Sequence, residues 1–397
     1  MLPTEIKKDI HWVGVVDWDL RDFHGYSTEK GSTYNAYLVK GTSKTVLFDT
    51  VNAKFTGEFI ENLREVIEPG KIDYIVCNHA EMDHTGSLAE IIDLVHPEKI
   101  ICNKICQDAL LAHYNRSDWP FEIIKEGDGL DLGGRTVQFF GSPMIHWPES
   151  MVSYIPEERL LISNDIFGQH WATSERFDDQ VNQGELFWQS AKYYANIFMP
   201  TSPSVAKFLA KLETNKLEPD MIAPDHGLIW RRGIPEIMKA YHSWSDGQTI
   251  PKALVVYDTM WGSTARMARA IGRGLSGNGI SVRLFDLHYN HRSDIATEML
   301  DARAIIIGSP IINNHILPKM ADLLSYLQGL KPMNKIGASF GSYGWKNMIT
   351  KMLNEQLEKM KVTLVDEGVS SKYVPSQEIL GQCFELGRKV RMVVLEG

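Results

Sequence analysis

Residues 251–397 alternate between apolar segments and segments with helical periodicity, and this alternation constrains the fold more than any other feature. The apolar segments cover residues 252–258, 281–287, 304–310, 335–342 and 362–366. The periodic segments lie between them, at 264–279, 316–330 and 346–360. Strands that are buried on both faces give near-continuous apolar runs of this kind. The pattern therefore predicts a doubly wound parallel sheet.

Residues 1–250 show a different pattern. Strand-like segments come first, at 10–19, 33–40 and 44–50, and helical patterns begin to interleave with strands from residue 55 onward. This order predicts a sheet-rich α/β domain with helices outside. Between the two parts, within residues 242–258, a helical pattern ends and a polar Gly/Pro segment precedes a buried strand. We therefore expect two domains, formed by residues 1–250 and 251–397.

Composition limits the class of protein. The chain has 397 residues and a net charge of −9, which argues against a broad nucleic-acid-binding surface. No apolar run approaches the ~20 residues that a membrane span requires, and the N-terminus lacks the apolar core of a secretory signal. The four cysteines form no C-x-x-C pair, so no rubredoxin-type site is encoded. We expect a cytoplasmic protein that binds neither membrane nor nucleic acid.

The stretch "NHAEMDHTGS" places His79, Glu81, Asp83 and His84 in six residues, in a loop between a strand and a helix that opens at Ser87. Further ligand-type residues also follow apolar strands, and these are His146, Asp165, Asp225 and His226. The carboxyl ends of strands in an α/β layer meet at one edge, so residues distant in sequence can converge there. The pattern indicates a metal site.

This ordered set resembles the metallo-β-lactamase fold in its flavodiiron variant, in which a flavodoxin-like domain follows directly. The resemblance covers the whole chain and implies an αββα first domain. By the family pattern one iron is held by His79, Glu81 and His146, the other by Asp83, His84 and His226, and Asp165 bridges them. Hydrolytic zinc relatives usually have a histidine at the position of Glu81. Four imidazoles and three carboxylates without a thiolate suit iron or manganese more than a structural zinc.

Other polar residues near these ligands carry weaker signals. His24 follows a strand and Trp147 follows a ligand, so we assign both to the wall of the substrate pocket. Asp225 is expected to orient His226 or to form a turn before Gly227. The remaining histidines are expected on the surface or satisfied in the core, namely His11, His96, His113, His170, His242, His288, His291 and His315.

Three loops at strand ends in the second part predict a flavin site. The first resembles the phosphate loop of flavodoxins and lacks the lysine of a P-loop. A hydroxyl-rich loop alone is often only an N-cap, but the other two loops add aromatic residues and glycines. The expected FMN-binding residues are Thr259, Met260, Trp261, Gly262, Ser263, Thr264, Ser309, Pro310, Ile311, Asn313, Asn314, Ser339, Phe340, Gly341, Ser342, Tyr343, Gly344 and Trp345. Ile311 departs from the threonine of many relatives.

The resemblance implies an oxidoreductase in which FMN supplies electrons to a non-haem di-iron site that reduces O2 to water, NO to N2O, or both. It also implies a separate electron donor of the rubredoxin type and a head-to-tail homodimer, alone or paired into a dimer of dimers. One alternative is a binuclear metallohydrolase fused to a flavodoxin-like domain, which Glu81 argues against. The other is a metal-free electron carrier, which leaves seven ordered ligands without an explanation.

Overall fold

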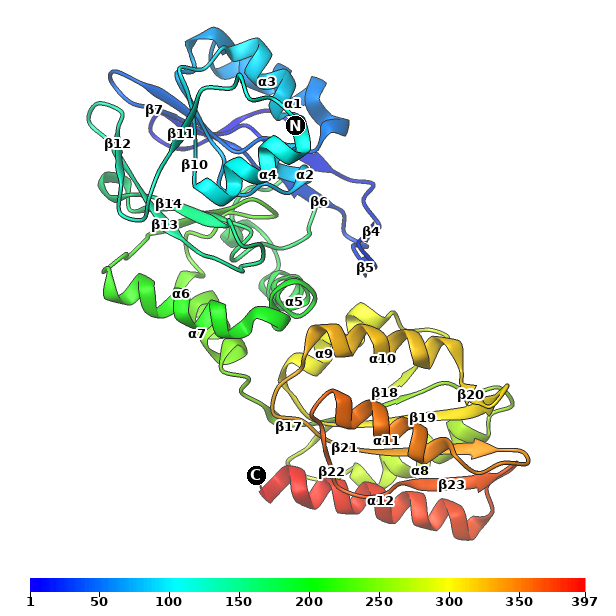
Figure 1. The fold of residues 1–397 in the computed structure, drawn as a ribbon. Coiled ribbons are helices and arrows are strands. Elements are labelled where there is room, and N and C mark those ends of the chain that lie inside the picture. The colour runs from blue at the N-terminus through cyan, green and yellow to red at the C-terminus, as the bar shows by residue number, and fades with distance from the viewer. Residues whose placement is uncertain (397) are drawn as a thin grey trace. The chain divides into compact units, whose positions relative to one another are not determined.

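The computed structural model describes residues 1–396 and divides into two compact units (Figure 1). The first unit contains Met1–Tyr193 and Pro203–His242. The second contains Tyr194–Ser202 and the chain from Ser243 onward. In the described residues no helix is both long and apolar enough to span a membrane.

Two β-sheets form the centre of the first unit. The first sheet has the order β1 (Thr4–Lys7), β2 (Ile10–Trp12), β7 (Tyr37–Lys40), β8 (Thr45–Phe48), β9 (Tyr74–Val76), β10 (Lys99–Cys102) and β11 (Phe121–Ile123). The second has the order β12 (Gly129–Asp131), β13 (Thr136–Gly141), β14 (Met151–Ile155), β15 (Leu160–Asn164) and β16 (Met221–Pro224). Two small antiparallel pairs lie outside them, β3 (Val15–Asp17) with β6 (Ser32–Tyr34) and β4 (Asp22–Phe23) with β5 (Tyr26–Ser27).

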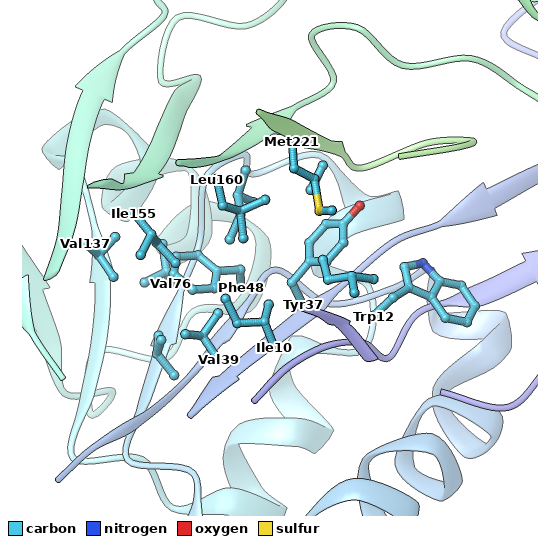
Figure 2. Packing of buried hydrophobic residues seen from close by; sticks show 14 of the residues in the cluster. Ile10, Trp12, Tyr37, Val39, Phe48, Val76, Val137, Ile155, Leu160 and Met221 are labelled. Atoms are coloured by element: carbon cyan, nitrogen blue, oxygen red, sulfur yellow. The ribbon is translucent and has the colours of Figure 1, made fainter. Parts of the chain in front are cut away.

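The inner faces of the two sheets share one hydrophobic core (Figure 2). Phe48 and Val76 of the first sheet pack in one cluster with Val137, Ile155 and Leu160 of the second. Residues of a strand alternate between its faces, so β8 contributes to two layers. Its Val46 and Phe48 belong to the core between the sheets, and Leu47 belongs to the layer beneath the helices. This double burial explains the continuous apolar run in the sequence.

Helices cover the outer faces of this sandwich. Against the first sheet pack α1 (Thr56–Val66), α3 (Leu88–Val95) and α4 (Lys104–Tyr114), through Phe59, Ile91 and Leu110. Figure 1 shows α6 (Ser202–Thr214) and α7 (Ile234–Ser245) beside the second sheet. Lys211 of α6 donates a hydrogen bond to the Gly141 carbonyl at the end of β13. The unit therefore has the predicted αββα arrangement. It also contains the single-turn α2 (Met82–Thr85) and α5 (Gln183–Tyr193).

The second unit is a parallel sheet of the order β18 (Ser281–Asp286), β17 (Ile250–Tyr257), β19 (Ala302–Ile312), β21 (Ile336–Tyr343) and β22 (Thr363–Leu364). β20 (His315–Ile316) pairs antiparallel with β19, and β23 (Val369–Lys372) pairs parallel with β21. In chain order this is 2-1-3-4-5, the flavodoxin-like arrangement of a doubly wound sheet. The predicted fold class is confirmed.

Helices cover both faces of this sheet. On one face α8 (Ser263–Leu275) and α12 (Gln377–Glu396) share a hydrophobic cluster with Val255 of β17. Figure 1 shows α9 (Arg292–Asp301) and α10 (Pro318–Leu330) on the opposite face, and α11 (Ile349–Lys359) follows β21. The helix predicted over 264–279 ends earlier, at Leu275, because Ser276 is extended.

Candidate metal centre and flavin cavity

Hydrogen bonds fix the loop after β9 at Asn78, immediately before its ligand-type residues in the chain. Asn78 donates its backbone N–H and its side-chain amide to the two oxygens of Asp49, both at 2.7 Å. Ser153 of β14 donates in turn to Asn78 Oδ1 at 2.9 Å. His79 follows outside any strand or helix, Glu81 has extended backbone just before α2, and Asp83 and His84 lie in α2. A buried polar network thus fixes the backbone at the point from which the four ligand-type residues follow.

One group of side chains converges around Glu81. The ligand atoms of His79, Glu81, His146 and Asp165 all lie within 4.8 Å of one another. His146 Nε2 is 3.0 Å from Glu81 Oε2 and 3.2 Å from Asp165 Oδ2. His79 Nε2 is 3.3 Å from Glu81 Oε2 and 3.4 Å from Asp165 Oδ2. Two imidazoles and two carboxylates therefore surround one point.

A second group converges around Asp83. Its members are Asp83, His84 and His226, with ligand atoms again within 4.8 Å. His226 Nε2 is 3.2 Å from Asp83 Oδ2, and His84 Nε2 is 3.5 Å from Asp83 Oδ1. Asp165 Oδ1 lies 3.1 Å from His84 Nε2, whereas its other oxygen faces the first group. Asp165 therefore stands between the groups and offers one oxygen to each.

The carboxylates create a negative field that favours cations. Burial by itself lowers the pKa of His79, but hydrogen bonds to Glu149 and Glu81 outweigh burial and raise it to about 9. Burial also lowers the pKa of His146, but Asp165 and Glu81 outweigh burial and raise this pKa to about 10. Burial raises the pKa of Asp165, yet the surrounding imidazoles hold it well below its usual value. The pocket therefore stabilises positive charge even where solvent is excluded.

Several buried polar atoms of this pocket have no hydrogen-bond partner in the part of the chain that the structure describes. They are both carboxylate oxygens of Asp83 and Asp225, both ring nitrogens of His84, and Oδ1 of Asp165. Unpartnered polar atoms at such depth are costly to a fold. Metal ions would satisfy those that face inward. The donors are nitrogen and oxygen only, which fits two iron ions.

The outward nitrogens of two of the imidazoles have hydrogen-bond partners, which set the tautomers of these rings. His79 Nδ1 donates to Glu149 Oε1 at 2.8 Å, and His226 Nδ1 donates to the Thr33 carbonyl at 2.7 Å. When a metal displaces the proton from Nε2, each ring therefore keeps its remaining proton on Nδ1 and presents Nε2 to the metal. Asp225 lies 3.7 Å from His84 Nδ1. The expectation that Asp225 orients His226 is wrong, because adjacent side chains diverge and the carboxylate faces His84.

Three further residues surround the ligands. His24 is at the tip of the β4–β5 hairpin, with Nε2 3.5 Å from Glu81 Oε1. Trp147 packs edge-on against His79 with ring centroids 5.2 Å apart. His170 is fully buried, its ring centroid lies 4.8 Å from that of His226, and its Nδ1 is 2.7 Å from Ser32 Oγ. His170 was expected on the surface or satisfied in the core. It lies in the core, where Nδ1 has a partner and Nε2 has no hydrogen-bond partner among the described residues, and its place behind a ligand carries no sequence signal.

In the second unit a cavity of about 490 Å³ opens where β17, β19 and β21 end. Its wall includes most of the predicted flavin-binding residues, namely Thr259, Met260, Trp261, Ser263, Pro310, Ile311, Asn313, Asn314, Ser342, Tyr343, Gly344 and Trp345. Thr259 Oγ1 is buried without a hydrogen-bond partner among the described residues, beside the N-terminus of α8. Unpaired donors at a helix start suit a phosphate. The cavity therefore fits FMN.

Six residues that the sequence assigned to FMN are not among those that line this cavity, and their contact with FMN stays a prediction. They are Gly262, Thr264, Ser309, Ser339, Phe340 and Gly341. Thr264 Oγ1 lies 3.2 Å from Ser342 Oγ, and a side chain at Gly341 would collide with the Ser309 carbonyl.

Four lining residues were missed, namely Ile312, Lys346, Tyr373 and Val374. Ile312 and Lys346 adjoin predicted residues, so a wider window along the same loops would have included them. Tyr373 and Val374 follow β23, whose sequence "VSSK" is too polar and too short to indicate a buried strand.

Comparison with known families agrees with both halves of this description. Residues 33–227 match the model of the ODP family beta lactamases, and residues 255–387 match the flavodoxin model. By class the molecule is thus a metallo-β-lactamase-like protein with a flavodoxin domain.

Relatives that match over nearly their whole length identify the family within this class. The chain is 47% identical to a nitric oxide reductase of Moorella thermoacetica over 98% of each chain. It superposes on the rubredoxin oxygen:oxidoreductase of Desulfovibrio gigas with a TM-score of 0.97 and 41% identity over 99% of each chain. It superposes on the flavodiiron protein of Giardia intestinalis with a TM-score of 0.96 and 32% identity, over 100% of this chain and 97% of that one. The chain belongs to the flavodiiron protein family.

Proposed function

We propose that this protein reduces O2 to water, NO to N2O, or both, with FMN and two irons as cofactors. The observation that carries the proposal is the position of Asp165, whose two oxygens face two separate groups of ligands. The names of the relatives support both substrates, since one is a nitric oxide reductase and another a rubredoxin oxygen:oxidoreductase.

The residues divide between two iron positions. His79, Glu81 and His146 would hold one iron, and Asp83, His84 and His226 would hold the other. Asp165 would contribute one oxygen to each. Three carboxylates among seven ligands neutralise much of the charge of two ferric ions, which eases a change of oxidation state. His24 and Trp147 line the pocket in which a small molecule meets the irons.

The chain's own groups orient the site. When bound, FMN accepts electrons and the irons transfer them to O2 or NO. Glu149 and the Thr33 carbonyl keep the Nδ1 atoms of their histidines protonated and direct each Nε2 inward. Thr259 and Ser263, with the start of α8, hold the flavin phosphate through neutral donors. The exposed rings of Trp261 and Trp345 would pack against the flavin.

The assembly belongs to the same proposal. Residues 1–250 form the di-iron domain and residues 251–397 the FMN domain of a head-to-tail homodimer, alone or as a dimer of dimers, in the cytoplasm. Trp261 and Trp345 at the cavity rim are 94% and 86% exposed, which supports an interface there. A separate rubredoxin-type protein donates electrons, as the name of the Desulfovibrio gigas relative suggests.

The test is a side-by-side measurement of anaerobic NO consumption and of O2 consumption, with reduced rubredoxin as donor. The protein is first analysed for two irons and one FMN per chain. We expect consumption of at least one gas with electrons taken from rubredoxin. Iron- and flavin-loaded protein that consumes neither gas would contradict the proposal. Zinc in place of iron together with ester or amide hydrolysis would instead favour the metallohydrolase alternative.

A further inference from the structure

The hairpin that carries His24 is too small to hold its own position. Its strands β4 and β5 have two residues each, and its turn is His24-Gly25 with φ values of 55° and 83°. Two positive φ values are typical of the type I′ turn. A two-stranded hairpin of this length is not stable by itself. The position of His24 therefore depends on the contacts that the rest of the first unit makes with the hairpin.

One face of the hairpin packs on the wall of the metal centre. Phe23 and Tyr26 are paired across the two strands. Their ring centroids lie 5.0 and 5.3 Å from that of His170, which in turn packs on the ligand His226. Rings in such contact set the depth of the hairpin, but they do not prevent it from sliding or tilting.

A buried lysine supplies directional contacts. Lys192, in the last turn of α5, has a fully buried side chain. Its ammonium donates to Ser27 Oγ at 3.0 Å, pairs with Glu29 Oε2 at 2.8 Å and lies 5.6 Å above the ring of Tyr26. Lysine is rarely buried to this extent unless its charge is paired. These contacts join α5 to the hairpin strand that follows His24.

We propose that Lys192 is a positioning residue, which locks the hairpin to α5 and so keeps His24 beside Glu81 at the metal centre. The inference rests on the proposed function, because it assigns His24 to the substrate pocket. His24 presents Nε2 3.5 Å from Glu81 Oε1, and within the described chain its side chain is 73% exposed, so its position depends on the hairpin that carries it. Loss of the lock releases His24 without removing any metal ligand.

The first test measures the hairpin and does not depend on activity. Hydrogen–deuterium exchange of residues 20–29 is followed by mass spectrometry in Lys192→Met and in Ser27→Ala. We expect exchange about tenfold faster or more in Lys192→Met, and a smaller increase in Ser27→Ala, with iron and FMN content unchanged. The control is Lys30→Met, because exposed Lys30 pairs with Glu185 of the same helix at 3.9 Å. Exchange at the wild-type rate in Lys192→Met overturns the inference and leaves the proposed function intact.

The second test asks whether Lys192 acts through His24. The kcat and KM for O2 or NO are measured for Lys192→Met, His24→Ala and the double variant. We expect Lys192→Met to raise KM more than it lowers kcat, and His24→Ala to have no further effect in the Lys192→Met protein. Additive effects of the two substitutions overturn the inference. Wild-type protein inactive towards both gases refutes the proposed function, and the exchange measurement still decides the role of Lys192.

Discussion

At the scale of single residues, Glu81 separates this site from a zinc hydrolase. Its Oε2 lies within 3.3 Å of both His79 Nε2 and His146 Nε2, and its Oε1 faces His24. A histidine at this position would replace a charged oxygen by a neutral nitrogen. It would also remove the hydrogen bonds that His146 and His79 make to Glu81. Burial raises the pKa of this carboxyl, but these hydrogen bonds outweigh burial and hold the pKa far below its usual value. Glu81 therefore supplies one of the three negative charges of the seven ligands.

The Glu81→His variant is expected to bind less iron and to lose reductase turnover while FMN stays bound. The loss of turnover should exceed the roughly 10–100-fold loss that follows removal of a residue that only hydrogen-bonds to a metal ligand. Iron content, flavin absorbance and gas consumption measure the three quantities. Glu65→His on the exposed face of α1 is the matched control. Wild-type turnover in Glu81→His would show that this carboxylate is not required.

Glu149 gives a second prediction, because it touches the ligand and not the metal position. Its Oε1 accepts hydrogen bonds from His79 Nδ1 at 2.8 Å and from the Ala80 N–H at 3.1 Å. Glu149→Gln keeps the shape but loses the charge that polarises His79. We expect about 10–100-fold weaker iron binding, measured by competition with a chelator, and normal FMN binding. Unchanged iron affinity would contradict the polarising role.

The convergence of the ligand-type residues could be predicted from sequence, because each follows an apolar strand whose carboxyl end the fold must bring to one edge. Their partners could not. Asp225 and His226 are neighbours in sequence, yet Asp225 faces His84 and His226 bonds to Thr33. The direction of each side chain is fixed by packing from several elements and leaves no trace in local spacing.

At the scale of elements, α8 combines two tasks. Its buried face, with Ala268 and Ile271, packs in one cluster with β17 and α12, which accounts for its strong periodicity. Its first residue, Ser263, lines the flavin cavity. The helix start carries partial positive charge and unpaired N–H groups, so it favours the phosphate of FMN.

A carboxylate at this position should compete with the phosphate. We expect Ser263→Glu to weaken FMN binding about 100-fold or more, because the two anions would lie a few ångströms apart at the cavity wall. Fluorescence titration of flavin-free protein with FMN gives the affinity. Ser276→Glu, just after the other end of α8, is the control and should bind FMN normally. Equal affinities in both variants would place the phosphate elsewhere.

Long elements were predictable from the sequence and short ones were not. The apolar runs of β17, β19 and β21 follow from burial on both faces. The β4–β5 hairpin has two residues per strand, and β23 is polar, so neither gives a periodic signal. Both nevertheless contribute to the sites, one through His24 and the other through Tyr373. The parts of the sites that the sequence missed lie on elements too short for a pattern.

At the scale of the whole molecule, the proposed dimer predicts which subunit's flavin works with which subunit's metal centre. In a head-to-tail arrangement the flavin of one subunit serves the metal centre of the other, so each working pair draws on two chains. The two variants above separate these contributions. Glu81→His damages the metal centre and leaves the flavin cavity, whereas Ser263→Glu does the reverse.

Mixing these two inactive variants should restore activity. A mixed dimer holds one complete pair, formed by the flavin of the Glu81→His subunit and the metal centre of the Ser263→Glu subunit. After free exchange of subunits, half of the dimers are mixed and each has one of two pairs, so we expect about a quarter of the wild-type turnover. Native mass spectrometry of differently tagged subunits verifies the exchange, and each variant mixed with itself is the control. Mixed dimers that form but stay inactive would show that flavin and irons cooperate within one chain, and would exclude the head-to-tail assignment.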